Sequence, residues 1–299
     1  MILTAVLLAQ LAVLLLGPGA ALLAGAAWPV RAPRAALVLW QAIGLTSGTA
    51  AVTAGALVAL APLGPDPRAA LAALWRGGYP VEAVGPAQVI AALATACLAG
   101  HLVGVTLGAL IRTVAQRRRH RALLDLLATP MGEVRVLDHP TAVAYCLPGL
   151  RRSRVVLSAG AVAVLAPEEL SAVLAHEKAH LAQRHDLVML PFTAWRRALP
   201  FVPGVRRAGS AVAALVEMLA DDQARHRHDP RVLARALLRV AAGQAPAGAL
   251  AAGESAVLAR VRRLVDPAPP VPRCLPLAAY TAALVLVTLP ALAVLAPAV

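Results

Sequence analysis

The sequence predicts a multi-pass α-helical membrane protein with a cytoplasmic α+β domain built on a small three-stranded sheet. Three observations support this fold class. Apolar residues make up 60% of the 299 residues, and the mean hydropathy of +0.72 is far above that of soluble globular proteins. Four apolar stretches are each long enough to span a bilayer. Between the third and the fourth, a more polar segment combines strand-like alternation with helical periodicity.

The predicted membrane spans define the domain boundaries. The first contains Gly17-Pro18-Gly19, which should kink it, and no basic residue precedes it, so we interpret it as a retained span rather than a signal peptide. The four spans are expected at residues 3–27, 35–63, 84–111 and 275–299. The chain is therefore divided into a membrane domain at 1–111, a cytoplasmic domain at 112–273 and a C-terminal membrane helix at 274–299.

Arginines set the predicted orientation. Arg31 and Arg34 lie in the first loop, whereas the second loop, Gly64–Ala83, is net neutral. Five more arginines follow the third span: Arg112, Arg117, Arg118, Arg119 and Arg121. By the positive-inside rule both chain termini are expected outside and the domain after the third span in the cytoplasm. His101, within that span, either lines a substrate or proton path or, as we favour, is a neutral imidazole bonded to a neighbouring helix.

The cytoplasmic segment is predicted to start with an amphipathic helix, followed by three strands and further helices. Leu187–Val205 is apolar but contains arginines and prolines, which favours a hairpin that abuts or partly enters the membrane. Gly243–Gly253 is rich in alanine and glycine and is expected to be a loop. The expected elements are a helix at 114–128, strands at 133–137, 142–147 and 154–158, a helix from Pro167, and helices at 231–240 and 254–265.

The charge of the chain does not indicate nucleic-acid binding. The formal net charge of +13 comes almost entirely from arginines, which border membrane segments, and aromatic residues are only 3%. We therefore expect the lipid bilayer as a partner and no direct contact with nucleic acid. Cys97, Cys146 and Cys274 are scattered, with no C-x-x-C pair, so neither a disulfide framework nor a metal role is predicted for them.

A H-E-x-x-H sequence at His176–His180 lies within the helix predicted from Pro167. Residues four apart stand above one another on a helix, so His176 and His180 can bind a single ion. Glu177 is turned about 100° away, where it can reach a metal-bound water instead of the metal. This is the geometry of a zinc hydrolase, with Glu177 as the catalytic acid–base group. His185, five residues after His180, would point away from the ligands on a straight helix and is interpreted as a polar helix-end residue.

Two acidic residues, Glu217 and Asp221, are placed to complete the site. Glu217 lies in an otherwise apolar helical run, where an ionised carboxylate is costly unless something pairs with it, and a zinc ion would be that partner. Asp221, four residues on, is placed to accept the spare ring N–H of a ligating histidine. We therefore predict one Zn²⁺ per chain held by His176, His180 and Glu217. His226 and His228 are candidates for stabilising the transition state, or are exposed loop residues.

The combined motifs resemble a known family. H-E-x-x-H followed by Glu217-Met-Leu-Ala-Asp221 resembles membrane-embedded gluzincin peptidases of the HtpX type and of the BlaR/MecR antirepressor type. Thr141–Gly149 and Arg154–Gly160 are similar to that family's segments before the catalytic helix, and Arg260–Leu264 to the segment leading back to the membrane. The BlaR/MecR type is closer, because three apolar segments precede the protease and one follows. The resemblance implies a minigluzincin-like zincin domain.

The family resemblance also implies a substrate-binding edge strand and an enzymatic activity. An extended peptide would add to the sheet at Ala142, Val143, Ala144 and Tyr145, or these residues form an ordinary structural strand. The implied activity is that of an integral-membrane zinc metalloendopeptidase cutting a protein or peptide substrate at the cytoplasmic membrane face. The substrate would be a cytoplasmic transcriptional repressor or, as in HtpX, a misfolded membrane protein. The chain lacks the penicillin-binding domain of the antirepressor sensors, so antibiotic sensing is not expected.

A non-catalytic membrane regulator with a structural zinc site is the remaining alternative. Structural zinc sites usually have a fourth protein ligand such as cysteine, and no cysteine lies near either predicted ligand helix in the sequence.

Overall fold

The computed structural model describes residues 1–77, 82, 84–149, 153–244 and 251–295. The chain forms two compact units. The first, which we call the helical unit, comprises Met1–Gly108, Phe192–Ala211 and Val271–Val299. The second, which we call the sheet unit, comprises Ala109–Pro191 and Val212–Pro270. The helical unit thus takes in a segment from the middle of the chain.

Among the described residues, four helical segments are long and apolar enough to cross a membrane: Ile2–Gly25, Pro33–Leu63, Pro86–Leu127 and Cys274–Leu295. This is consistent with a membrane protein. The first segment is irregular where the sequence predicts a kink: α1 (Ile2–Leu14) passes through a π-helical turn at Leu15–Gly19 into α2 (Ala20–Gly25). Pro18 lies inside that turn and lacks the N–H of a regular helical bond, so the wider turn accommodates it.

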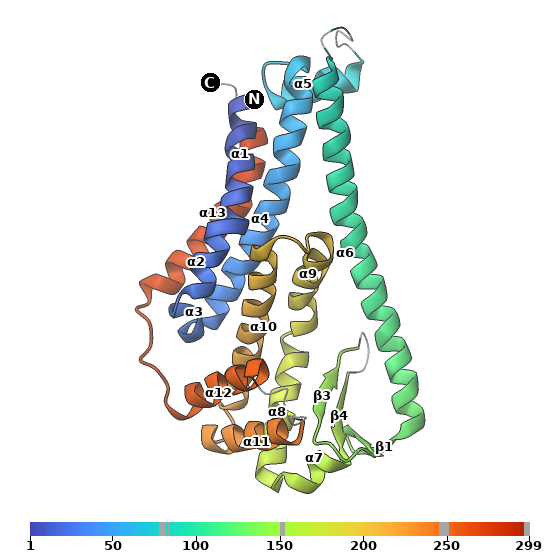
Figure 1. The fold of residues 1–299 in the computed structure, drawn as a ribbon, viewed down its shortest axis with the longest axis vertical. Coiled ribbons are helices and arrows are strands. Elements are labelled where there is room, and N and C mark those ends of the chain that lie inside the picture. Colours follow the sequence, from blue (N-terminus) through green and yellow to red (C-terminus); the bar gives the residue numbers. More distant parts are fainter. Residues whose placement is uncertain (78–81, 83, 150–152, 245–250, 296–299) are drawn as a thin grey trace. The chain divides into compact units, whose positions relative to one another are not determined.

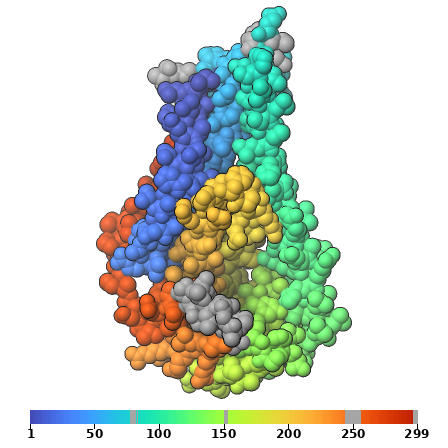
Figure 2. Space-filling view, in the orientation of Figure 1, coloured from blue at the N-terminus to red at the C-terminus, as the bar shows by residue number. Residues whose placement is uncertain are grey.

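The helical unit is organised around α4 (Pro33–Leu60), which contacts both α1 and α13 (Cys274–Leu295) (Figure 1). In the space-filling view the dark blue atoms of α1 lie directly against the lighter blue atoms of α4 (Figure 2). Small residues allow this close approach. The shared core consists of Ala5, Leu8, Ala12, Ala50, Ala54 and Leu57.

Short helices connect the spans. α3 (Trp28–Arg31) precedes α4, and a 3₁₀ turn at Ala61–Leu63 follows it. The loop predicted at Gly64–Ala83 is wrong in part, because it contains α5 (Pro67–Arg76). Asp66 caps α5 by accepting a hydrogen bond from the Ala69 backbone N–H at 2.8 Å. Residues 78–81 and 83 of the predicted loop lie outside the described residues.

The predicted hairpin at Leu187–Val205 is present, and its tip packs within the helical unit. It consists of α9 (His185–Ala198) and the start of α10 (Pro203–Ala224). The Trp195 indole of α9 lies against Gly44 of α4. His101 Nε2 lies 3.3 Å from the Ala198 carbonyl oxygen, so the imidazole is bonded to a neighbouring helix as favoured from the sequence.

The contact between Gly44 and Trp195 predicts an effect on stability. A methyl group at Gly44 would overlap the Trp195 ring, so Gly44→Ala should lower the free energy of unfolding by about 1–3 kcal/mol through overpacking. Gly48→Ala is the matched control, because a Cβ there would lie 3.8 Å from Leu102 Cδ1, an ordinary contact. Thermal unfolding in detergent, followed by circular dichroism, measures both. Equal midpoints for the two variants would contradict the prediction.

One long helix replaces two predicted ones. The sequence predicts a third span ending at residue 111 and a separate helix at 114–128, but α6 runs unbroken over Pro86–Leu127. The arginine-rich segment after the span contains neither glycine nor proline, and arginine and leucine are good helix formers. The helix therefore continues through the predicted break.

The sheet has four strands, so the predicted three-stranded sheet is wrong by one strand. The added strand, β1 (Ala128–Met131), pairs antiparallel with β2 (Val134–Leu137) through a tight turn in which Gly132 has φ +58°. β2 is parallel to β4 (Arg154–Ser158), and β4 is antiparallel to β3 (Ala144–Leu147). The order β1-β2-β4-β3 leaves β3 at one edge of the described sheet.

Helices cover this sheet. α7 (Ala159–Val164) follows β4 directly, capped by the Ser158 hydroxyl, which accepts from the Ala161 N–H at 3.0 Å. α8 (Pro167–Ala182) contacts β3 and α11 (Pro230–Gln244), which in turn contacts α12 (Ala251–Val265). The middle of the predicted loop at Gly243–Gly253 lies outside the described residues. The core between α8, α10, α11 and α12 contains Ala172, Ala224, Leu233, Ala234 and Leu264.

Candidate metal centre

The helix that carries the H-E-x-x-H sequence, α8, is fixed at both ends. At its start the Glu169 carboxylate accepts from the Ala166 N–H at 3.0 Å, and Arg239 pairs with this buried carboxylate at 2.6 Å. Just beyond its C-terminus Arg184 adopts φ +51°, a left-handed conformation that interrupts the helix before α9 (His185–Ala198). These contacts hold the histidine-bearing face in one orientation.

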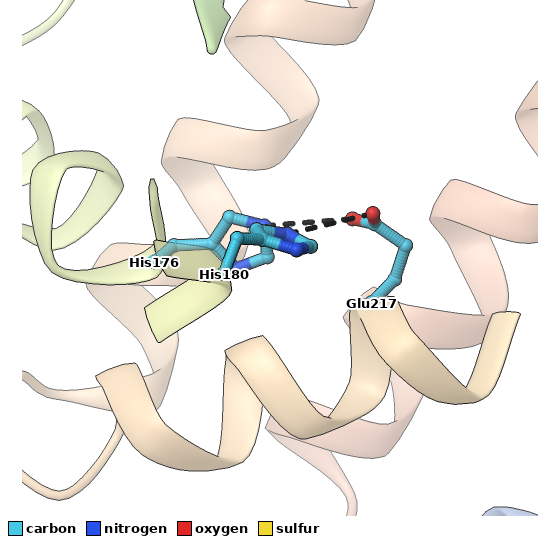
Figure 3. Close-up of side chains that lie close together, drawn as sticks. All are labelled: His176, His180 and Glu217. Carbon is cyan, nitrogen blue, oxygen red and sulfur yellow. Dashed lines mark hydrogen bonds and ion pairs between the residues drawn. The ribbon is translucent and has the colours of Figure 1, made fainter. Parts of the chain in front are cut away.

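The structure brings His176, His180 and Glu217 together. Both histidines point from α8 toward Glu217 on α10 (Figure 3). The two Nε2 atoms lie 3.1 Å apart, and the Glu217 oxygens lie 3.4 Å from His176 Nε2 and 3.5 Å from His180 Nε2. Ligands at about 2.0–2.1 Å from a tetrahedral ion lie about 3.3 Å from one another. Two imidazole nitrogens and a carboxylate oxygen at these separations fit a zinc ion with one position left open.

Residues 110–248 match the family model described as Peptidase family M48. This is a zinc metallopeptidase family, and the matched segment contains all three clustered residues. The comparisons with curated proteins and with solved structures gave no match. We refer to residues 110–248 as the M48-matched segment.

Asp221 lies behind the cluster, as the sequence predicts for a carboxylate that contacts a ligand. It is 1% exposed, and its Oδ1 lies 3.0 Å from His176 Nδ1. Arg260 on α12 binds it with two parallel hydrogen bonds, from Nε to Oδ2 and from Nη2 to Oδ1, each 2.7 Å long. Burial alone would raise the pKa of Asp221, but the bonds from Arg260 and His176 lower it to about 2.

Arg260 is a site residue that the sequence analysis missed. Besides holding Asp221, it donates from Nη1 to Glu217 Oε2 at 2.9 Å, and it lies beyond the end of the M48 match. The available signal was its position on the apolar face of α12, between Val257 and Leu264 at helical spacing. A largely buried guanidinium needs acidic partners, which the buried Asp221 and the partly exposed Glu217 provide.

Glu177 lines the same cavity as the two histidines. Burial raises its pKa, and the nearby Glu217 charge adds to this increase. The Cys146 thiol on β3 lies near the Glu177 carboxylate, and burial together with that negative charge raises its pKa to about 12. Cys146 is therefore a protonated thiol near neutral pH.

A cavity of about 400 Å³ opens over the cluster. One wall is the edge strand β3, through Ala144, Tyr145 and Cys146; the opposite wall is apolar, through Leu233, Leu237 and Val240 of α11. The edge was predicted at Ala142–Tyr145, and the structure places the strand two residues later, at Ala144–Leu147. Ala142 and Val143 lie in the segment before it, where Val143 N–H donates to the Ser158 hydroxyl at 2.9 Å.

The other three histidines considered in the sequence lie after α10 or at the start of α9. His226 is exposed after the end of α10, and His228 lines a separate pocket with Ser171, Lys178 and Arg227. The structure gives neither residue a place in the cavity over the cluster. His185, interpreted as a polar helix-end residue, is buried and lies against His180.

The pKa values of the histidines predict that one proton leaves when zinc binds. Burial alone would lower the pKa of His176, but its contacts with Asp221 and Glu217 raise that pKa to about 9. Burial lowers the pKa of His180 to about 4. Between pH 5 and 8 only His176 holds a proton that zinc must displace, so zinc affinity should rise about tenfold per pH unit.

Calorimetry at pH 6.0 in buffers of different ionisation enthalpy counts the released protons. This pH lies below the value of about 7 at which zinc-bound water ionises. Release of two protons, or an affinity independent of pH, would contradict the assignment.

Proposed function

We propose that this protein is an integral-membrane zinc metalloendopeptidase that hydrolyses a protein substrate at the cytoplasmic membrane face. The main support is the convergence of His176, His180 and Glu217 on one point in a cavity bordered by β3, the edge strand of the described part of the sheet. The M48 match and the four apolar helices support the proposal independently. The arginines after the third span support a cytoplasmic location for the M48-matched segment, with both chain termini outside.

In the proposed mechanism, His176, His180 and Glu217 hold the metal. Bound there, zinc supplies Lewis acidity to the scissile carbonyl and increases the acidity of a water. Glu177 accepts the proton of the attacking water and returns it to the leaving amine, and its raised pKa suits both steps. The substrate backbone pairs with β3, which would place the scissile bond between the strand and α8. Asp221 and Arg260 orient His176 and Glu217.

Metal removal tests this proposal. The purified full-length chain in detergent should contain about one zinc per molecule and cleave an unfolded protein such as casein. A chelator should abolish cleavage, and added zinc should restore it. A chain that binds one zinc but cuts neither casein nor itself would instead support the non-catalytic regulator.

The substrate is proposed to be a cytoplasmic repressor, because three apolar segments before the protease and one after it resemble the antirepressor type more than the HtpX type. The alternative is a quality-control role on misfolded membrane proteins. Comparing the proteomes of cells that make the wild type or Glu177→Gln distinguishes the two. Accumulation of one DNA-binding protein supports the first role, and accumulation of many membrane proteins supports the second.

A further inference from the structure

His185, the first residue of α9, contacts the proposed ligand His180 on the side away from the cluster. Its ring is 4% exposed, and its Nδ1 lies 2.9 Å from His180 Nδ1. The two rings are nearly perpendicular, at 81°, with centroids 4.8 Å apart. We infer that His185 is a positioning residue that holds His180 in the orientation and tautomer required to bind zinc. This inference rests on the proposed metal site.

The hydrogen-bonding atoms fix the tautomers along this contact. His180 Nε2 faces His176 and Glu217, so it must carry the free lone pair, and His180 Nδ1 must carry the proton. That N–H donates to His185 Nδ1, which must then be the unprotonated nitrogen. His185 Nε2 consequently carries a proton and donates it to Gln183 Oε1, 3.3 Å away. Each ring proton in this series has an acceptor.

The break between α8 and α9 brings His185 into contact with His180. On a straight helix a residue five positions on is rotated about 500°, which would point it away from His180. The left-handed Arg184 interrupts the helix, so the straight-helix rotation does not apply, and the His185 ring at the start of α9 lies against His180 of α8. Asp186 then anchors this start, because its buried carboxylate accepts from Arg117 of α6 at 2.8 Å.

His185 therefore does for His180 what Asp221 does for His176. In both cases a buried group contacts the ligand's Nδ1 and leaves Nε2 for the metal. Loss of such an outer contact typically weakens metal binding about 10–100-fold. A neutral imidazole adds no charge to the site, so the expected contribution of His185 is orientation of the His180 ring.

Two substitutions at position 185 test this role through zinc affinity. His185→Phe keeps a ring of similar volume but removes the acceptor, and should weaken zinc binding about 10–100-fold in a chelator competition. His185→Asn places a carbonyl oxygen near the position of Nδ1, and should bind zinc within about threefold of the wild type. Thermal unfolding of both zinc-free variants reports the packing of the ring separately.

The outcomes separate this inference from the proposed function. Wild-type affinity in His185→Phe, or equal losses in both variants, would overturn the positioning role, because packing alone would then explain His185. If His185→Phe does not fold, wild-type affinity in His185→Leu overturns the inference, and a 10–100-fold loss supports it. A wild type that binds no zinc removes the proposed function and this inference together.

Discussion

Glu177→Gln should abolish peptide hydrolysis while leaving zinc bound. Glutamine has nearly the same shape as glutamate but cannot accept the proton of the attacking water, and proton transfer by such a group contributes about 10²–10⁴-fold to the rate. We therefore expect kcat/KM for a peptide substrate to fall at least about 10²-fold. Because Glu177 is not one of the three clustered residues, the zinc content should remain that of the wild type.

The matched control is Glu168→Gln, the same substitution at an exposed position in the first turn of α8. This variant should retain full activity and zinc, because its carboxylate lies outside the cavity. Cleavage of a fluorogenic peptide and metal analysis of the purified proteins measure both quantities. If Glu177→Gln cleaved at the wild-type rate, the general acid–base assignment would be wrong even with the metal site intact.

Features that depend on local sequence could be predicted. The apolar spans and the helix of the H-E-x-x-H sequence follow from hydropathy and helical spacing, which are properties of contiguous residues. Glu217 was found because a single carboxylate in an apolar run requires a partner. β1 was missed because the segment Ala128–Met131 contains a proline and adjoins a helix, and its strand conformation depends on pairing with β2.

Residues whose position depends on a helix break or on tertiary packing could not be predicted in the same way. His185 was assigned on the assumption of a continuous helix, and the break occurs at Arg184, a residue type that rarely adopts a left-handed conformation. Arg260 reaches Asp221 from another helix, and the two positions are 39 residues apart in sequence. Sequence spacing relates residues within one helix, so it predicts neither the contact of His185 with His180 nor that of Arg260 with Asp221.

The buried pair of Arg260 and Asp221 should make one of the largest single contributions to the stability of the sheet unit. Arg260→Leu would remove both hydrogen bonds that Arg260 donates to Asp221, which is 1% exposed, and leave His176 as its charged neighbour beside Glu217. Breaking a buried ion pair in this way typically costs about 3–5 kcal/mol in the free energy of unfolding. The Asp221 pKa of about 2 has the same origin, because its contacts with Arg260 and His176 stabilise the charged carboxylate. The Asp221 contribution is therefore present above pH 4 and is lost as the pH falls through about 2.

A second pair between the same two helices provides the control for this prediction. Arg263 donates to both oxygens of Asp222 at 2.8 Å, in the same forked geometry, but the two side chains are 14% and 22% exposed. Because water can solvate Asp222 once Arg263 is removed, and Arg225 remains 3.2 Å from it, Arg263→Leu should cost only about 1 kcal/mol. Unfolding of both variants at pH 7 with a chelator present, which removes any contribution from zinc, compares the two pairs directly. Equal losses for the two arginines would mean that burial of Asp221 does not determine the strength of its pairing, and Arg260 would then be better explained by its contact with Glu217 alone.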